Sequence, residues 1–244
     1  MEVCGMSKAS RWVFCTDLHG DMQEVATVRS FHKFCDFWKP TIKVFGGDCF
    51  DFRALRSKAS EGERYESGLR DFQAGLDFIR KYKPTAFLYG NHDQRLINLL
   101  TSPNGNVRDQ AQSMIDEIEH ACGDCAVIPY DKRLVYKIGD LSCIHGFGSG
   151  EGTVRKAATI YEKVIIGHLH RAEVVNMPGL RRREGYACPS LCKLSMPYNS
   201  THLASLAHEN GWAYGEVLPS GHTTVHLARR VGGHWHLPTE FRSL

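Results

Sequence analysis

The sequence predicts an α/β domain of packed layers with a largely parallel sheet. Apolar runs at residues 11–17, 41–48 and 85–90 are predicted strands, and the stretches between them have helical periodicity. An order of strand, helix, strand, helix, strand is typical of a parallel sheet covered by helices. We expect one domain over residues 1–244, because no repeat or linker divides the chain.

The helices of the first half are predicted from periodicity. Residues 21–38 have amphipathic spacing, and residues 52–82 predict one or two helices broken near Gly62. A proline lies two residues beyond the end of each of these segments and stops it. Residues 94–100 predict a short helix and residues 107–123 a long amphipathic one.

The second half predicts mostly strands, with one helix at residues 153–161. The expected strands are residues 125–130, 134–139, 141–146, 163–170, 185–191, 211–218, 222–231 and 234–238.

Composition predicts a cytoplasmic protein without membrane association. The net charge of +3 is only mildly basic, the apolar runs are too short to span a bilayer, and residues 1–12 lack a signal-peptide core. Nine cysteines without disulfide-scaffold spacing indicate a reducing compartment. Cys122, Cys125, Cys188 and Cys192 could together bind a structural zinc, but we favour free or buried thiols.

Five apolar runs stop at side chains that can bind metal. Strand ends converge on one edge of an α/β sheet, where ligand sites form. One alternative for the triplet at residues 91–93 is a polar turn. The side chains at these strand ends are Asp17, His19, Asp48, Asn91, His92, His145, His168 and His170.

A mixture of imidazole and carboxylate suits borderline divalent ions such as manganese, iron and zinc. Two ions about 3.5–4 Å apart can hold both an attacking hydroxide and a phosphoryl oxygen. The cluster therefore predicts a dinuclear hydrolase.

The ordered motifs resemble those of the calcineurin-like metallophosphoesterases. They are "DLH" (17–19), "GD" (47–48), "GNHD" (90–93), His145 and "GHLH" (167–170), and the resemblance covers about residues 11–175. It implies two packed mixed β-sheets flanked by helices, a four-layer αββα sandwich.

The resemblance also implies two divalent ions that share one carboxylate. Manganese is the expected metal, with iron, zinc and nickel as alternatives. The first ion would bind Asp17, His19, Asp48 and His170. The second would bind Asp48, Asn91, His145 and His168.

In such enzymes a hydroxide activated by the two metals attacks phosphorus. The resemblance implies that His92 protonates the leaving oxygen or stabilises phosphoryl charge, and that Asp93 orients its ring. Arg53 and Arg95 are candidates for binding the substrate phosphate, with surface salt bridges as the alternative. Asp51 could lie near the metals or cap the helix that follows, and we favour the cap.

The expected function is metal-dependent hydrolysis of phosphate esters, leaning to phosphodiesters such as nucleic acid or a cyclic nucleotide. Two features favour diesters: the basic run at residues 181–183, which could border the site and attract a polyanion, and the incomplete match to the G-D-x-x-D-R-G pattern of protein phosphatases. The default interpretation of the basic run is a solvated turn. The alternative function is a phosphomonoesterase acting on nucleotides, small molecules or phosphoprotein. A non-catalytic binding module is disfavoured, because every motif residue is retained.

Overall fold

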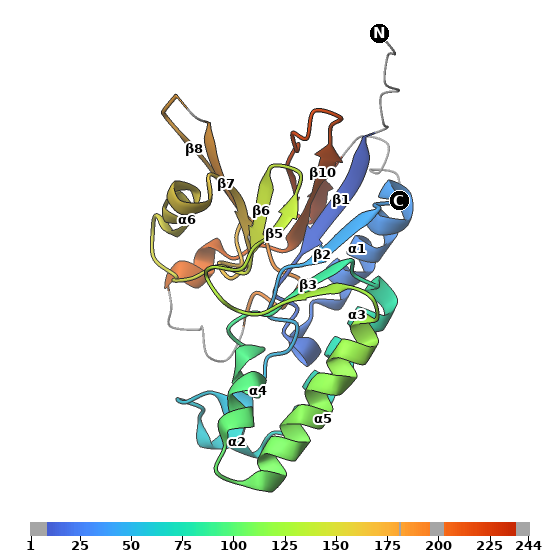
Figure 1. Cartoon of the computed structure of the whole chain (residues 1–244), viewed down its shortest axis with the longest axis vertical. Coiled ribbons are helices and arrows are strands. Elements are labelled where there is room, and N and C mark those ends of the chain that lie inside the picture. Colours follow the sequence, from blue (N-terminus) through green and yellow to red (C-terminus); the bar gives the residue numbers. More distant parts are fainter. Residues whose placement is uncertain (1–8, 181, 196–202, 238–244) are drawn as a thin grey trace.

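The structure is a computed structural model that describes residues 9–180, 182–195 and 203–237. Its strands form two mixed sheets, which pack against each other and carry helices on their outer faces (Figure 1).

Seven strands form the first sheet: β1 (Ser10–Cys15), β2 (Ile42–Phe45), β3 (Ala86–Leu88), β4 (Ala126–Ile128), β10 (Gly211–Val217), β11 (His226–Val231) and β12 (His234–His236). Their spatial order is β12-β11-β10-β1-β2-β3-β4. The strands from β1 to β4 are parallel, as the alternation of strands and helices predicted, and the three C-terminal strands add an antiparallel flank.

The second sheet contains β5 (Tyr136–Ile138), β6 (Leu141–Ile144), β7 (Lys163–Ile166), β8 (Glu173–Met177) and β9 (Arg183–Ala187). Its order is β5-β6-β7-β9-β8, with β6, β7 and β9 parallel. The sequence did not predict β8. This strand is an edge strand whose residues are half-buried or exposed, so it lacks the apolar run that marks the central strands.

Helices connect and cover the sheets. The α-helices are α1 (Val25–Trp38), α2 (Glu61–Tyr65), α3 (Gly68–Tyr82), α4 (Gln94–Asn98), α5 (Gly105–Cys122) and α6 (Thr153–Tyr161). Four short 3-10 helices are η1 (Gly20–Met22), η2 (Arg53–Leu55), η3 (Leu99–Thr101) and η4 (Leu203–Ala207). No described helix has the length and apolar character needed to cross a membrane.

The prolines end α1 and α3 as predicted, because the residue before each, Lys39 or Lys83, adopts a left-handed conformation that closes the helix. The predicted break near Gly62 is wrong in position. Gly62 lies inside α2, and the break comes at Ser67, whose side chain accepts a hydrogen bond from the Leu69 amide and caps α3.

Alternating side chains on the central strands build the layers. Trp12 and Phe14 of β1 point between the sheets, where they belong to one core with residues such as Leu141 and Ile165 of the second sheet. Val13 and Cys15 point the other way, into the core under α1 and α3. A third cluster packs α6 against the outer face of the second sheet. The four-layer αββα arrangement is therefore confirmed.

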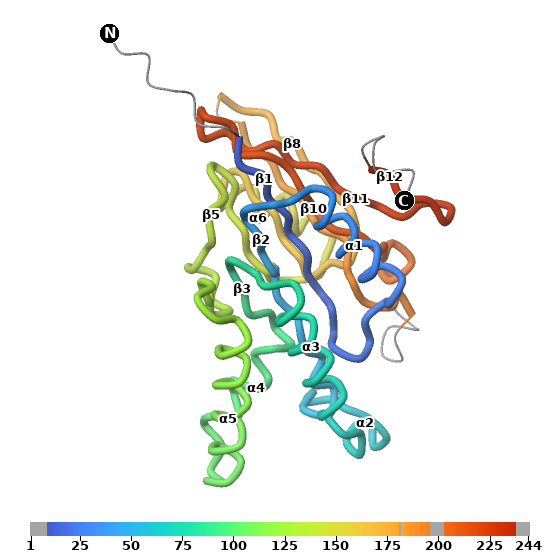
Figure 2. The backbone as a smooth tube through the Cα atoms, turned by 90° about the vertical axis from the view of Figure 1, so that its right-hand side faces the viewer, coloured from blue at the N-terminus to red at the C-terminus, as the bar shows by residue number. Residues whose placement is uncertain are grey.

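Beyond the sheets, the chain forms a helical lobe that contains η2, α2, α4, η3 and the N-terminal half of α5 (Figures 1 and 2). The N-terminal part of α3 closes this lobe toward the sheets.

We expect Phe31→Ala to lower the free energy of unfolding by about 3–5 kcal/mol, because it leaves a cavity in the core. Phe31 of α1 is fully buried, with its ring centroid 5.3 Å from that of Tyr82 and 5.5 Å from that of Trp212. Urea unfolding measures the loss. Val25→Ala, on the same helix at a position 60% exposed, should change stability by less than about 0.5 kcal/mol. Equal effects of both changes would contradict the assigned core.

Candidate metal centre

The predicted metal-binding residues follow the ends of parallel strands from both sheets. Asp17 and His19 follow β1, and Asp48 follows β2. Asn91 comes after β3, His145 directly after β6, and His168 and His170 after β7. The hydrogen bonds and close contacts described below bring all seven side chains to one edge of the sandwich.

The backbone at this edge is unusual. Five of the seven residues have left-handed φ angles between 52° and 66°, a region that non-glycine residues rarely adopt. Strain of this kind persists where the surrounding structure fixes it, and it concentrates at functional sites. The five residues are Asp17, His19, Asp48, His168 and His170.

Asp48 lies at the middle of the cluster. Its Oδ2 atom is 3.2 Å from His145 Nε2 and 4.0 Å from His19 Nε2. The other oxygen, Oδ1, accepts a hydrogen bond from the His92 amide at 2.8 Å. One carboxylate oxygen is therefore placed between imidazoles that come from different sheets.

On one side of Asp48, two imidazoles and a carboxylate converge. His170 Nε2 is 3.1 Å from Asp17 Oδ1 and 3.3 Å from His19 Nε2. Asp17 Oδ2 accepts hydrogen bonds from the Thr16 hydroxyl and the His168 amide, which fix the carboxylate.

On the other side, His145 Nε2 is 3.1 Å from Asn91 Oδ1. One ring nitrogen of His168 lies within 4.8 Å of the ligand atoms of His145 and Asp48, so these three residues could hold an ion.

The donor set fits a cation. His145 Nδ1 donates to the Gly46 carbonyl and His19 Nδ1 donates to Asp51, which leaves the Nε2 atoms of both rings with inward-facing lone pairs. These lone pairs face other acceptor atoms, including Asp48 Oδ2 and Asn91 Oδ1. Buried acceptors in contact need a positive charge between them, which a divalent ion supplies.

The electrostatics of the site also favour a bound cation. Burial raises the pKa of Asp48, but His145 and His92 outweigh burial and hold that pKa well below its usual range. Burial lowers the pKa of His145, whereas Asp48 and Asp17 raise it to about 9. The pKa of His168 falls to about 4 through burial and the nearby His145. The negative potential that favours a proton on His145 also favours a metal ion.

His92 faces the same space, but its supporting residue differs from the predicted one. Its Nε2 lies 3.9 Å from Asp48 Oδ2, and its Nδ1 is 2.7 Å from Asp51 Oδ1. Asp51 is fully buried, and the same oxygen is 3.2 Å from His19 Nδ1. The favoured interpretation of Asp51 as a helix cap is wrong, because this carboxylate links His92 to a metal-site imidazole.

The predicted role of Asp93 as the residue that orients His92 is also wrong. Its carboxylate accepts hydrogen bonds from the backbone amides of Asp48, Phe50 and Gly90 at 2.8–3.0 Å. Burial and the nearby Asp48 raise the pKa of Asp93 to about 7. Asp93 therefore braces the backbone that carries Asp48, and the ring of His92 is oriented by Asp51.

The two candidate arginines lie close to the site in different settings. Arg53 forms a bidentate ion pair with Asp21, at 2.7 and 2.9 Å, and a second ion pair with Glu66. Arg95 donates to the Asp51 carbonyl at 2.6 Å. The ion pairs of Arg53 agree with the salt-bridge alternative, and substrate binding by Arg53 or by Arg95 remains a prediction.

The basic run does not border this edge. Arg183 begins β9, and β9 runs parallel to β7, whose far end leads to His168. About four residues of strand, or roughly 13 Å, separate the start of β9 from the metal edge. Arg182 pairs with Glu184 at the same distant edge, and Arg181 lies outside the described residues. The prediction that this run borders the site is therefore wrong, and its contact with a polyanion stays a prediction.

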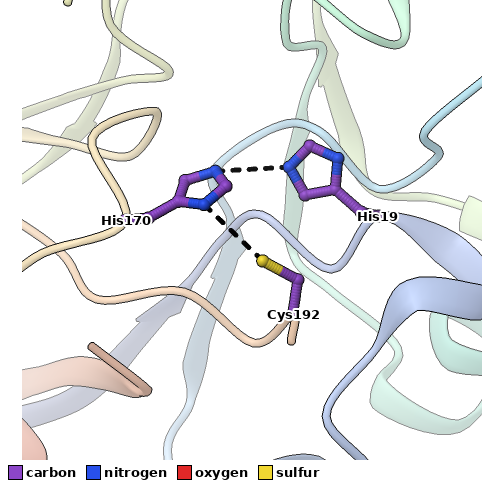
Figure 3. A group of neighbouring side chains, drawn as sticks. All are labelled: His19, His170 and Cys192. Carbon is purple, nitrogen blue, oxygen red and sulfur yellow. Dashed lines mark hydrogen bonds between the residues drawn. The ribbon is translucent and has the colours of Figure 1, made fainter. Parts of the chain in front are cut away.

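Cys192 lies behind His170 and was not predicted to be part of the site. Figure 3 shows His170 between two neighbours, with one ring nitrogen toward His19 and the other toward Cys192. The Nδ1 to Sγ distance is 3.6 Å. Because Nε2 of His170 faces Asp17 and His19, we assign Cys192 as the hydrogen-bond partner that fixes the ring. The zinc alternative required four cysteines close enough to share one ion. Among the described residues, no group of side chains able to bind metal contains four cysteines.

We expect Asp51→Ala to weaken Mn²⁺ binding about 10- to 100-fold, because the change removes the acceptor that holds His19 in place. Isothermal titration calorimetry measures the change. Asp77→Ala, which removes an exposed carboxylate on α3, is the matched control. Unchanged Mn²⁺ affinity in Asp51→Ala would show that this carboxylate does not support the site.

The Co²⁺-loaded protein should show no thiolate-to-metal charge-transfer absorption, because Cys192 faces the back of His170. The Cys192→Ser variant should therefore have the same near-ultraviolet spectrum as the unchanged protein. An absorption band that disappears in Cys192→Ser would instead make Cys192 a direct ligand.

No protein-family model matches the sequence, and no curated protein does either. Among solved structures, the chain resembles vacuolar protein sorting 29 from Cryptosporidium parvum, with a TM-score of 0.52 and 11% identity over 94% of this chain and 96% of that one. A metallophosphoesterase from Sphaerobacter thermophilus gives a TM-score of 0.49 and 14% identity over 90% and 88% of the two chains. At such identities the first likeness establishes the fold alone. The chain thus shares its two-sheet fold with this solved structure.

Proposed function

We propose that the protein is a metal-dependent hydrolase of phosphate esters that uses two divalent ions and prefers phosphodiesters. The observation that carries this proposal is the position of Asp48 Oδ2, between His145 Nε2 at 3.2 Å and His19 Nε2 at 4.0 Å, with His92 Nε2 3.9 Å away. A carboxylate shared by two groups of ligands, with one further imidazole at its side, suits phosphoryl chemistry.

The ligands divide into two groups around the shared Asp48. One ion would be held by Asp17, His19, Asp48 and His170. The other would be held by Asp48, Asn91, His145 and His168. When bound, divalent ions lower the pKa of water and offset charge on phosphoryl oxygens. Nitrogen and oxygen ligands of this kind support manganese as the metal, with iron, zinc or nickel as alternatives.

His92 is the proposed general acid. Its Nδ1 is held by Asp51, so its Nε2 is the nitrogen that can hold a proton toward the leaving oxygen. Because Asp51 is fully buried and fixed by its own backbone contacts, His92 keeps this orientation without a substrate.

The ion pairs of Arg53 support a diester over a monoester. A phosphomonoester carries up to two negative charges at neutral pH, and its recognition favours extra cations near the phosphate. Arg53, the cation nearest to Asp51 in sequence, is committed to Asp21 and Glu66. A phosphodiester, with a single negative charge, makes less demand on such cations.

Phosphomonoester hydrolysis is the second candidate, and Arg95 is the observation that favours it. Its guanidinium lies beside Asp51 and close to His92, where its fork could bind a terminal phosphate. A pure binding module is disfavoured, because all seven predicted ligands are present and gathered. Eight described cysteines are free thiols, which supports the cytoplasm as the location.

The Mn²⁺-loaded protein should hydrolyse bis-p-nitrophenyl phosphate faster than p-nitrophenyl phosphate. His92→Ala should lower turnover about 100- to 10,000-fold, because it removes the general acid. Metal content and thermal midpoint should stay unchanged in this variant. His120→Ala, an exposed histidine on α5, is the control and should keep full activity.

Faster hydrolysis of the monoester would favour the second candidate. Full activity in His92→Ala would show that His92 is not the general acid. If neither ester were hydrolysed in the presence of metal, the non-catalytic binding module would be the better interpretation.

A further inference from the structure

Two aromatic side chains stack beside the predicted ligand His145. The ring planes of Tyr130 and Phe147 differ by 22°, and their centroids are 4.8 Å apart. Tyr130 also makes an edge contact with the His145 ring, at 5.8 Å between centroids. The Tyr130 hydroxyl donates to the Gly146 carbonyl at 3.1 Å, which fixes this ring against the metal edge. We call the pair of Tyr130 and Phe147 the aromatic shelf.

The aromatic shelf is open to solvent at Phe147, which is 37% exposed. Tyr130 covers one face of the Phe147 ring, so the opposite face is available to a ligand. Leu134, which is 45% exposed, lines the same small pocket as His145 and both rings of the shelf. Sites for small organic ligands combine an apolar or aromatic wall with a few polar groups, and the shelf and the predicted metal ligands provide both.

The predicted ligand cluster is accessible beside the shelf. Asn91, His92 and His168 are half-buried, whereas the other predicted ligands are buried. Asn91 Oδ1 is 3.1 Å from His145 Nε2, and the ring centroid of His168 is 5.2 Å from that of His145. Both accessible ligands therefore contact the imidazole that the shelf also contacts. A phosphate ester bound at these ligands would have an organic group within reach of Phe147.

His92 lies at the other end of the cluster. Its ring centroid is 4.5 Å from that of His19, a predicted ligand of the first ion. The shelf instead contacts His145, a predicted ligand of the second ion. If His92 protonates the leaving oxygen, the leaving group extends toward His92. A phosphodiester carries a second organic group, which stays on phosphorus and extends away from His92, on the side of the shelf.

We propose that the aromatic shelf binds the retained ester group of a phosphodiester, and that this group contains a planar ring, either an aryl group or a nucleobase. This inference rests on the proposed function and adds the substrate class. The ring would stack on the open face of Phe147, while the metal edge binds the phosphoryl group. A monoester has no retained organic group, so the shelf would not contribute to its binding.

The test compares p-nitrophenyl diesters that share one leaving group. Methyl p-nitrophenyl phosphate retains a methyl group, phenyl p-nitrophenyl phosphate retains an aryl ring, and thymidine 5′-(p-nitrophenyl phosphate) retains a nucleobase on a sugar. Release of p-nitrophenol by the Mn²⁺-loaded protein gives kcat/KM for each ester. Phe147→Leu keeps an apolar cover over Tyr130 but removes the planar ring. We expect it to lower kcat/KM for the phenyl ester about 10-fold relative to the methyl ester.

Two further variants are the controls. Phe147→Trp keeps a planar ring and should keep the phenyl-to-methyl ratio of the unchanged protein. Tyr65→Ala removes an aromatic side chain that is 84% exposed on α2, in the helical lobe, and should also keep the ratio. A ratio that falls no further in Phe147→Leu than in Tyr65→Ala would overturn the proposal. A ratio that falls equally in Phe147→Leu and Phe147→Trp would overturn it too, because stacking would not be the cause.

The thymidine ester distinguishes the two kinds of ring. A larger effect of Phe147→Leu on this ester than on the phenyl ester would identify the nucleobase as the ring that the shelf binds. A larger effect on the phenyl ester would identify an aryl group.

Hydrolysis of the methyl ester separates this inference from the proposed function. If the methyl ester is hydrolysed but Phe147→Leu leaves the phenyl-to-methyl ratio unchanged, the inference fails and the proposed function stands. If none of the three esters is hydrolysed in the presence of Mn²⁺, the proposed function fails and the inference fails with it.

Discussion

The loop from Gly46 to Phe52 depends on two buried carboxylates that bind its backbone. Asp93 accepts the amides of Asp48 and Phe50, and Asp71 accepts those of Asp51 and Phe52 at 2.7–2.9 Å. Four of five successive amides are thereby fixed, and the loop follows a path that places Asp48 among the other predicted metal ligands and Asp51 beside the ring of His92. Charge-assisted hydrogen bonds to the amides offset only part of the lost hydration, because burial still raises the pKa of Asp71 to about 6 and, together with Asp48, that of Asp93 to about 7. Asp93 thus holds the backbone of Asp48, and Asp71 holds that of Asp51.

Two glycines let neighbouring segments approach closely at this loop. A Cβ on Gly90 would come within 2.1 Å of Asp48 Oδ1, and one on Gly47 within 2.5 Å of His145 Nδ1. Glycine is therefore required at both positions for steric reasons, and at Gly47 also because φ is +98°. In both motifs the glycine makes room for a predicted ligand from another motif: Gly47 for His145, and Gly90 for Asp48.

The layered fold and the gathering of the motif residues at one edge were predictable, because both rest on local patterns. Parallel strands end at one edge, so the polar residue after each apolar run has its position fixed by the run. The partner of His92 was not predictable in this way. Asp51 and Asp93 are both carboxylates near the motifs, and the choice between them depends on a turn through Phe52, which has a φ of 45°. The predicted position of the basic run beside the site was wrong for a related reason. The run is close to "GHLH" in sequence, but the chain reverses direction between β8 and β9 and places the run at the opposite edge.

Each proposed ion takes ligands from both sheets: Asp17, His19, Asp48 and Asn91 come from the first sheet, and His145, His168 and His170 from the second. Neither half of the chain contains a complete set, so high metal affinity arises only after the sheets have docked. During folding the ions would bind late, after the two sheets have packed together, because contacts between residues as far apart as 17 and 170 form slowly. The concentration of metal would then set the rate of unfolding, and with it the lifetime of the folded protein. The rate of folding would stay nearly unchanged.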